Sequence, residues 1–241
     1  MTANPTSTAS TGSAHPPMTH LPAQKHGAIQ QLFDGVWFVR GVAKLPMLVP
    51  VKITRSMTIV RGVDGLVLFN SMRLTEAGLA ELDALGEVTH VVRLAGFHGR
   101  DDGFYRERYG AQILAIEGQA YVRGLGKPGP SYLEPDAWLT ADSPLPIADA
   151  SLRVIGSSTP TEALCLLARE GGVLIAGDSL QNTPVPDEFC NLPGRLAMKR
   201  FGFLVAHNVG PGWLEHAKPS AAEVRGLLDL DFENVLPGHG T

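Results

Sequence analysis

The sequence has few cysteines, no long apolar run and no concentration of positive charge. Its 241 residues include only Cys165 and Cys190, which is too few for the disulfide framework of a small secreted protein. No apolar run approaches the ~18 residues that a membrane-spanning helix needs. A net charge of -4 and the lack of a Lys/Arg stripe give no electrostatic basis for nucleic-acid binding. We therefore expect a soluble, cytoplasmic protein that binds neither nucleic acid nor membrane.

The first 27 residues are rich in serine, threonine, proline and alanine, with almost no large apolar side chains. Such a segment cannot bury enough surface to offset the entropy lost on ordering, so the sequence predicts a disordered tail over residues 1–27. The segment also lacks the apolar stretch of a secretory signal. We expect residues 28–241 to form one domain.

Hydrophobic periodicity then predicts alternating strands and helices. The expected strands of the first half are 35–41, 56–61, 65–70, 90–94 and 111–116, with helices at 75–85 and from residue 103. The expected strands of the second half are 151–156, 162–169, 172–177 and 232–236, with a helix at 219–230. The Gly/Pro-rich stretch 181–219 is expected to be irregular, with helical turns near 195–204. This order indicates a mixed α/β protein.

Three of these strands end in residue types that bind metals. The loop A-G-F-H-G-R-D-D contains His98 and Asp102, V-L-I-A-G-D ends at Asp178, and N-V-L-P-G-H ends at His239. Rigid strand ends in α/β folds aim such side chains at a common point. Each motif alone also fits an ordinary turn, in which a carboxylate bonds nearby backbone N–H groups. Together and in this order they favour a metal site.

The motifs also carry a resemblance to a family. The strand hairpin, the helix, the His/Asp loop, G-S-S-T-P-T-E-A-L (156–164), A-G-D-S (176–179) and L-P-G-H-G (236–240) resemble the metallo-β-lactamase superfamily over roughly residues 32–241. The last two are the most specific, because they look like that family's bridging-aspartate and last-histidine motifs. The resemblance implies a four-layer αββα sandwich of the α/β class, with the site at one edge between two β-sheets.

The family's H-x-H-x-D-H signature is missing. One register, which needs no gap, places Arg93, Ala95 and Phe97 at three of its ligand positions and His98 at the last histidine. The alternative register makes His98 the first histidine and places Asp102 on the aspartate. We prefer the first register.

Two further positions depart from the family. Ser157 or Ser158 replaces a histidine of its G-H-T-P-G segment, and Asn70 stands where many members have aspartate. In the first register the chain therefore lacks the three histidines of the family's first metal and keeps a reduced set of ligands for the second.

The resemblance implies that His98, Asp178 and His239 hold one metal. Two histidines and a carboxylate suit a single divalent ion with open positions for water or substrate; we expect zinc, with iron or manganese as alternatives, or a site that has decayed to none. The implied function is a metal-dependent hydrolase of a small-molecule ester, amide or thioester. Asp102 would be its general base, or an extra ligand in the second register.

The rival hypothesis is a non-catalytic binding or structural protein on the same fold, because four ligand positions of the family are lost. In that case Arg100 would pair with Asp178 and close the site, whereas convergence of the three ligands in an open cleft would favour the enzyme. Iron at a two-His, one-carboxylate site would leave a redox role open. The expected partner is a small-molecule substrate, and homo-oligomerisation is left open.

Overall fold

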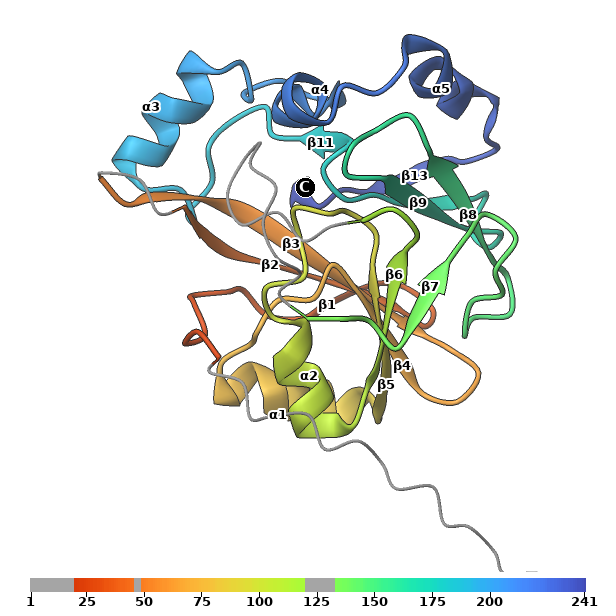
Figure 1. The fold of residues 1–241 in the computed structure, drawn as a ribbon. Helices are drawn as coiled ribbons and strands as arrows, with labels where there is room; N and C mark the ends of the chain where they lie inside the picture. The colour runs from red at the N-terminus through yellow and green to blue at the C-terminus, as the bar shows by residue number, and fades with distance from the viewer. Residues whose placement is uncertain (1–19, 46–48, 120–132) are drawn as a thin grey trace, which may run out of the picture.

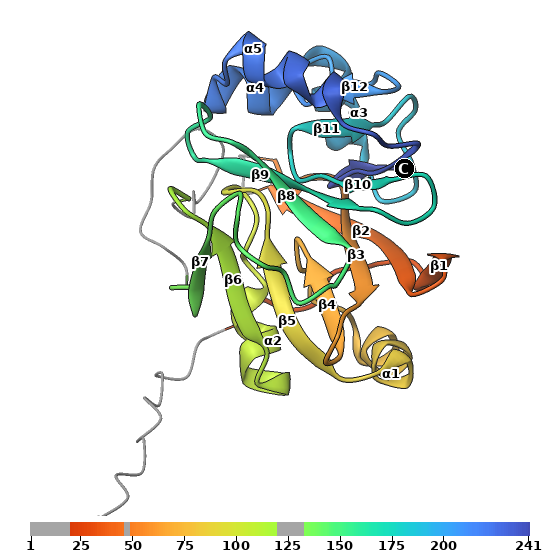
Figure 2. The same cartoon turned by 90° about the vertical axis from the view of Figure 1, so that its right-hand side faces the viewer.

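The computed structural model describes residues 20–45, 49–119 and 133–241. Two β-layers face each other, and helices cover both outer faces (Figures 1 and 2). The elements of the first layer and its helices are β1 (Gln30–Phe33), β2 (Val36–Leu45), β3 (Val51–Arg61), β4 (Leu66–Phe69), α1 (Glu76–Leu85), β5 (Val88–Arg93), α2 (Asp102–Tyr109), β6 (Gln112–Ile116) and β7 (Ala137–Leu139). Those that follow are β8 (Ala150–Ile155), β9 (Glu162–Leu167), β10 (Val173–Ile175), β11 (Leu180–Asn182), α3 (Leu192–Arg200), β12 (Asn208–Val209), α4 (Pro211–Ala217), α5 (Ala221–Arg225), a 3-10 turn (Gly226–Asp229), β13 (Asn234–Leu236) and β14 (His239–Gly240).

The first layer is a seven-stranded mixed sheet in the order β1-β2-β3-β4-β5-β6-β7. Strands β1 to β4 pair antiparallel and β4 to β7 pair parallel. The parallel strands are apolar on both faces, as expected for strands covered on both sides. Helices α1 and α2 cover the outer face, where Leu79, Leu82 and Tyr105 pack against Val91 and Ile113.

The second layer consists of a four-stranded sheet, β13-β10-β9-β8, and a three-stranded sheet, β12-β11-β14. Trp213 of α4 and Leu227 of the 3-10 turn pack on its outer face with Leu164 and Leu174. Between the two layers lies the central core, with Cys165 among its members. The structure is therefore the four-layer αββα sandwich predicted from the sequence.

The largest difference from the sequence prediction lies in residues 181–219. This stretch was expected to be mostly irregular, but it contains α3, α4 and the short strands β11 and β12. The helix predicted over 219–230 is shorter, because α5 ends at Arg225 and a 3-10 turn follows. Ser220 caps α5 by accepting a hydrogen bond from the backbone N–H of Glu223 at 3.2 Å. None of the helices in the described residues is both long and apolar enough to cross a lipid bilayer.

Part of the segment predicted as a tail contacts the domain. Residues 1–19 lie outside the described residues, but residues 20–27, here called the N-terminal strap, run along β2. The N–H of Gly27 donates to the carbonyl of Arg40 at 2.8 Å, and the N–H of Val42 donates to that of Lys25 at 2.9 Å. Residues 20–27 therefore contact the domain that was predicted to begin at residue 28.

Candidate metal centre

Three strand ends meet at one edge of the sandwich. His98 follows β5, Asp178 follows β10, and His239 begins β14 just after β13. Strands β10 and β13 run parallel, so their carboxyl ends reach the same edge. The N–H of Ala163 donates to the carbonyl of Leu94 at 3.0 Å and joins the end of β5 to the second layer.

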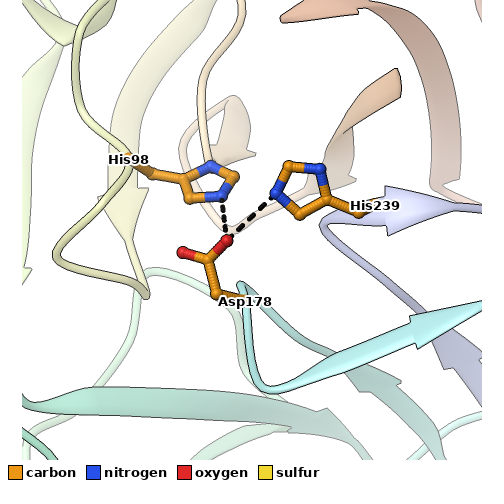
Figure 3. Close-up of side chains that lie close together, drawn as sticks. All are labelled: His98, Asp178 and His239. Carbon is orange, nitrogen blue, oxygen red and sulfur yellow. Dashed lines mark hydrogen bonds and ion pairs between the residues drawn. The ribbon is translucent and has the colours of Figure 1, made fainter. Parts of the chain in front are cut away.

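The three side chains converge on one carboxylate oxygen (Figure 3). Asp178 Oδ1 lies 3.0 Å from His239 Nε2 and 3.4 Å from His98 Nε2. All three candidate ligand atoms lie within 4.8 Å of one another. The structure thus brings together the three residues that the sequence singled out as metal ligands.

A backbone hydrogen bond fixes the tautomer of His239. Its Nδ1 lies 2.7 Å from the carbonyl oxygen of Thr54, and because a carbonyl only accepts, Nδ1 carries the hydrogen. In the neutral ring, Nε2 is then an acceptor, and it faces the carboxylate of Asp178. Two acceptors at 3.0 Å repel each other unless a proton or a metal ion lies between them. The geometry therefore requires a cation at this point.

The charges of this group shift its pKa values in opposite directions. Burial would raise the pKa of Asp178, but the charges of His98 and His239 and their hydrogen bonds hold it well below its ordinary value. Burial would lower the pKa of His239, but the hydrogen bond to Asp178 and the charge of that carboxylate raise it above its ordinary value. The carboxylate is thus held in the ionised form that binds metals.

One oxygen of this group has no partner. Asp178 Oδ2 is buried and makes no hydrogen bond to any described residue. An unpaired buried carboxylate oxygen is costly, whereas two imidazole nitrogens and a carboxylate are a donor set that zinc, iron and manganese accept. No other group of three or more His, Cys, Asp and Glu side chains in the described part of the chain has such a geometry. The residues present therefore fit a single divalent metal.

Strand β3 supports both histidine-bearing segments. Thr54 holds His239 through its carbonyl, and the next residue, Arg55, forms a buried ion pair with Asp101 in the turn that carries His98. Asp101 also accepts the N–H of Arg73 at 3.1 Å. Neighbouring residues of one strand thus fix the two histidines relative to each other.

Asn70 links the two sheets behind the site. Its amide nitrogen donates to the carbonyl of Ala176 at 3.0 Å, and its amide oxygen accepts the N–H of Leu94 at 3.3 Å. The residue has φ 53°, a left-handed conformation that asparagine tolerates better than most residues. The side chain therefore joins the segment before His98 to the segment before Asp178.

Glu162 is a supporting residue that the sequence analysis missed. Its side chain is fully buried and accepts the N–H of Ser179 at 2.7 Å, next to Asp178. Burial, and after it the charge of Asp178, raises the pKa of Glu162 well above its ordinary value. The signal available in the sequence was one acidic residue at the start of an otherwise apolar strand.

Asp102 does not join the three ligands. Its carboxylate is fully buried; Ser71 Oγ donates to Oδ1 at 2.7 Å, and Arg93 Nε lies 3.8 Å from Oδ2. Burial, the largest influence, raises the pKa of Asp102 despite the attraction of Arg93. These contacts describe a structural carboxylate, so the general-base role of Asp102 stays a prediction that the geometry does not support.

The Arg100 contact that would have closed the site is not formed. Arg100 Nε lies 3.5 Å from Asp101 Oδ1, while Asp178 pairs with the two histidines. Of the other positions aligned with family ligands, Arg93 and Ala95 are fully buried, and Phe97 packs against the core around Trp213. None of the three offers a metal ligand.

Ser157 and Ser158, one of which replaces a family histidine, both bond to other residues. Ser157 Oγ donates a hydrogen bond to Glu223, and Ser158 Oγ donates to the carbonyl of Ile155 at 2.8 Å. Burial raises the pKa of the Cys190 thiol above its ordinary value.

Comparison with known proteins identifies the fold. No family model matches the chain, and no curated protein matches it. Solved structures do. The DIM-1 metallo-β-lactamase, from a crystal exposed to ceftazidime, matches with a TM-score of 0.58 and 14% identity over 92% of both chains. FIM-1 from Pseudomonas aeruginosa in its mono-zinc form matches with a TM-score of 0.54 and 12% identity over 91% of this chain and 90% of that one. A metallo-β-lactamase from Hirschia baltica matches with a TM-score of 0.53 and 16% identity over 89% of this chain and 92% of that one.

The chain therefore has the metallo-β-lactamase fold, as its strand order and its two specific motifs predicted. At such low identity the likeness shows the fold alone, since one fold hosts many chemistries. Within that fold it carries a partial His/Asp/His group in place of the full ligand set that the resemblance implies.

Proposed function

We propose that the protein is a metal-dependent hydrolase with one divalent metal held by His98, Asp178 and His239. The observation that carries this proposal is the carboxylate of Asp178, which faces two imidazole nitrogens with one oxygen and leaves its other buried oxygen without a partner. Zinc is the favoured metal because it accepts both nitrogen and oxygen ligands.

The protein's own residues prepare this site in three ways. The carbonyl of Thr54 holds the His239 ring so that Nε2 points at the site. Asp178 is held in its ionised form, which is the state that a metal requires, and the two histidines would bind the metal in their neutral form. A divalent metal bound here supplies Lewis-acid activation of a carbonyl and a water nucleophile at neutral pH.

The burial of the site bears on its substrate. The side chains of His98, Asp178 and His239 are only 8%, 12% and 17% exposed. A site enclosed to this extent favours a small ester, amide or thioester over a macromolecule.

A second candidate is a non-catalytic protein on the same fold. The observation that favours it is the buried Arg93 and Ala95 at positions aligned with ligands, neither of which can bind a second metal. In that case the histidines pair with Asp178 through a proton, and the group is a structural element between the layers.

Metal content decides between the two candidates. We expect elemental analysis of protein purified without chelator or added metal to give close to one equivalent of zinc, iron or manganese, and Asp178→Ala to lose it. Asp142→Ala, which changes an exposed aspartate outside the group of candidate ligands, should keep it. Loaded wild-type protein should then hydrolyse p-nitrophenyl acetate or an acetyl thioester faster than the Asp178→Ala variant.

A wild-type protein without metal, and with no uptake from added zinc, iron or manganese, would refute the hydrolase and leave the non-catalytic candidate. Full metal binding without hydrolysis of either ester type would retain the metal centre and reject the activity.

A further inference from the structure

A guanidinium lies inside the turn that carries His98. Arg93 is the last residue of β5, and its side chain is 1% exposed. Residues 94–101, here called the His98 turn, follow it and end where α2 begins. A buried arginine loses its hydration, and its Nε and Nη1 make no hydrogen bond within the described parts of the chain. Burying a guanidinium with two nitrogens that lack hydrogen bonds destabilises the fold, which indicates a role for Arg93 other than stability.

The His98 turn is wrapped directly on this side chain. A Cβ atom placed on Gly99 would lie 2.6 Å from Arg93 Cδ and 2.8 Å from Nη1, both far inside contact distance. Gly99 also has φ 101°, which side chains rarely adopt. The backbone next to His98 is therefore shaped around the guanidinium and tolerates only glycine at position 99.

Asp102, at the end of the turn, pairs with the guanidinium. Its Oδ2 lies 3.8 Å from Arg93 Nε, and Ser71 anchors its other oxygen. The N–H of Asp102 donates to the carbonyl of Gly99 at 3.2 Å and closes the end of the turn. Earlier in the turn, the N–H of His98 donates to the carbonyl of Ala95 at 3.1 Å. The two charged side chains thus bracket the whole segment.

We propose that Arg93, held by Asp102, is a positioning residue for the candidate metal centre. Its guanidinium is a fixed internal cation around which the His98 turn is built, so that His98 faces Asp178 before any metal binds. The consequence for metal affinity rests on the proposed function, whereas the ordering of the turn does not depend on it. Lysine cannot replace arginine here, because its single ammonium group lacks the planar guanidinium against which Gly99 packs.

Hydrogen exchange of the metal-free protein tests the ordering. In the presence of a chelator, we expect the amides of His98 and Asp102 to exchange at least about tenfold faster in Arg93→Met than in wild type. The reason is that the turn loses the guanidinium on which it packs. Arg93→Lys should behave like Arg93→Met. The matched control is Arg106→Met. Arg106 belongs to α2 and forms an ion pair with Asp136 at 2.9 Å, so this variant also removes an arginine from an ion pair. It should leave exchange in the His98 turn unchanged.

A double variant separates loss of order in the His98 turn from a general loss of stability. Arg93→Met leaves Asp102 buried without its cation and destabilises the fold for that reason alone. Arg93→Met/Asp102→Asn removes the stranded charge and keeps the contact to Ser71, so its melting temperature should recover. If the amides of the His98 turn still exchange fast in this stable double variant, the guanidinium positions the turn. Wild-type exchange rates in the double variant would overturn the proposal.

Zinc affinity measured by competition with a chromophoric chelator tests the consequence. We expect the stable double variant to bind zinc about tenfold to a hundredfold more weakly than wild type, as for other supporting residues around metal sites. Equal affinity in the two proteins would overturn the positioning role. If wild type itself binds no zinc, the proposed function fails, and the exchange rates still decide whether Arg93 orders the turn.

Discussion

Asp101 and Asp102 are neighbours in the sequence, yet their pKa values move in opposite directions. Burial is the largest single influence on both groups and by itself would raise both pKa values. Asp101 has Arg55 and Arg100 as close charges, together with hydrogen bonds from Arg55 and Arg73, and these bring its pKa below the ordinary value. For Asp102 the lowering influences are the more distant Arg93, the hydroxyl of Ser71 and, more weakly, the charge of His98, while Asp101 adds to the effect of burial, so its pKa stays raised. The number and closeness of the partners decide the ionisation of each carboxyl group.

Replacing Asp101 should therefore have a pH-dependent cost. Because its folded pKa is lowered, its stabilising contribution is present above the ordinary carboxyl pKa of about 4 and is lost as pH falls through the folded value. Asp101→Asn leaves Arg55 buried without its partner, so we expect a loss of about 3 kcal/mol at pH 7. The free energy of unfolding by urea should show this difference at pH 7 and pH 5 and a smaller one at pH 3.

The exposed Asp142→Asn serves as the control, with a difference below about 0.5 kcal/mol at all three pH values. A deficit of Asp101→Asn that stays constant or grows towards pH 3 would contradict a lowered folded pKa.

At the scale of elements, the ligands were predictable and their supports were not. His98, Asp178 and His239 each follow an apolar strand within a few residues, so a pattern along one strand reveals them. Asn70 acts on the carbonyl of Ala176 across the gap between the layers, whereas Glu162, at the start of β9, acts on the N–H of Ser179 just after β10, the neighbouring strand of its own sheet. Nothing in the local sequence reveals these partners, because the Asn70 contact exists only after the two layers have packed and the Glu162 contact only after β9 and β10 have paired.

Asn70 should contribute both hydrogen bonds and backbone conformation. Asn70→Ala leaves the carbonyl of Ala176 and the N–H of Leu94 without their side-chain partner, and places a Cβ-bearing residue without polar atoms at φ 53°. We expect a loss of about 2 kcal/mol from the hydrogen bonds and about 1 kcal/mol more from the left-handed backbone. Chemical denaturation of both Asn70→Ala and Asn70→Gly separates the two effects, since glycine adopts this φ without strain.

Asn70→Gly should thus lose only the hydrogen-bond contribution. An Asn70→Gly variant as stable as wild type would show that the link between the sheets contributes nothing, and equal losses in both variants would show that the backbone is not strained.

For the whole molecule, the sequence predicted the αββα order because buried parallel strands such as β4 and β10 are short apolar runs between glycine-rich turns. It did not predict α4, since Pro211 and Gly212 at its start favour a turn by composition, and the helix forms where Trp213 can be buried. Nor did it predict the contacts of the N-terminal strap. That segment has few apolar side chains and gains its order from backbone hydrogen bonds to the edge of β2, which composition does not reveal.

Removing the N-terminal strap should therefore weaken the fold. The strap contributes two backbone hydrogen bonds to β2, and His26 contributes a third contact, because its Nε2 accepts the N–H of Thr75 at 2.9 Å beside the start of α1. A chain that begins at residue 28 loses these three and further contacts of the strap, such as the hydrogen bond from Arg73 to the carbonyl of Leu21 at 2.7 Å. At about 1 kcal/mol for each of the three, we expect a loss of at least about 3 kcal/mol. For a domain of this size that corresponds to a melting temperature lower by about 6 to 12 °C.

A chain that begins at residue 20 keeps every one of these contacts and is the matched control. Calorimetry of the two truncated proteins beside wild type measures the difference. Equal melting temperatures for both truncations would mean that the strap lies on β2 without stabilising it. A drop confined to the shorter chain would show that the strap is part of the folded domain.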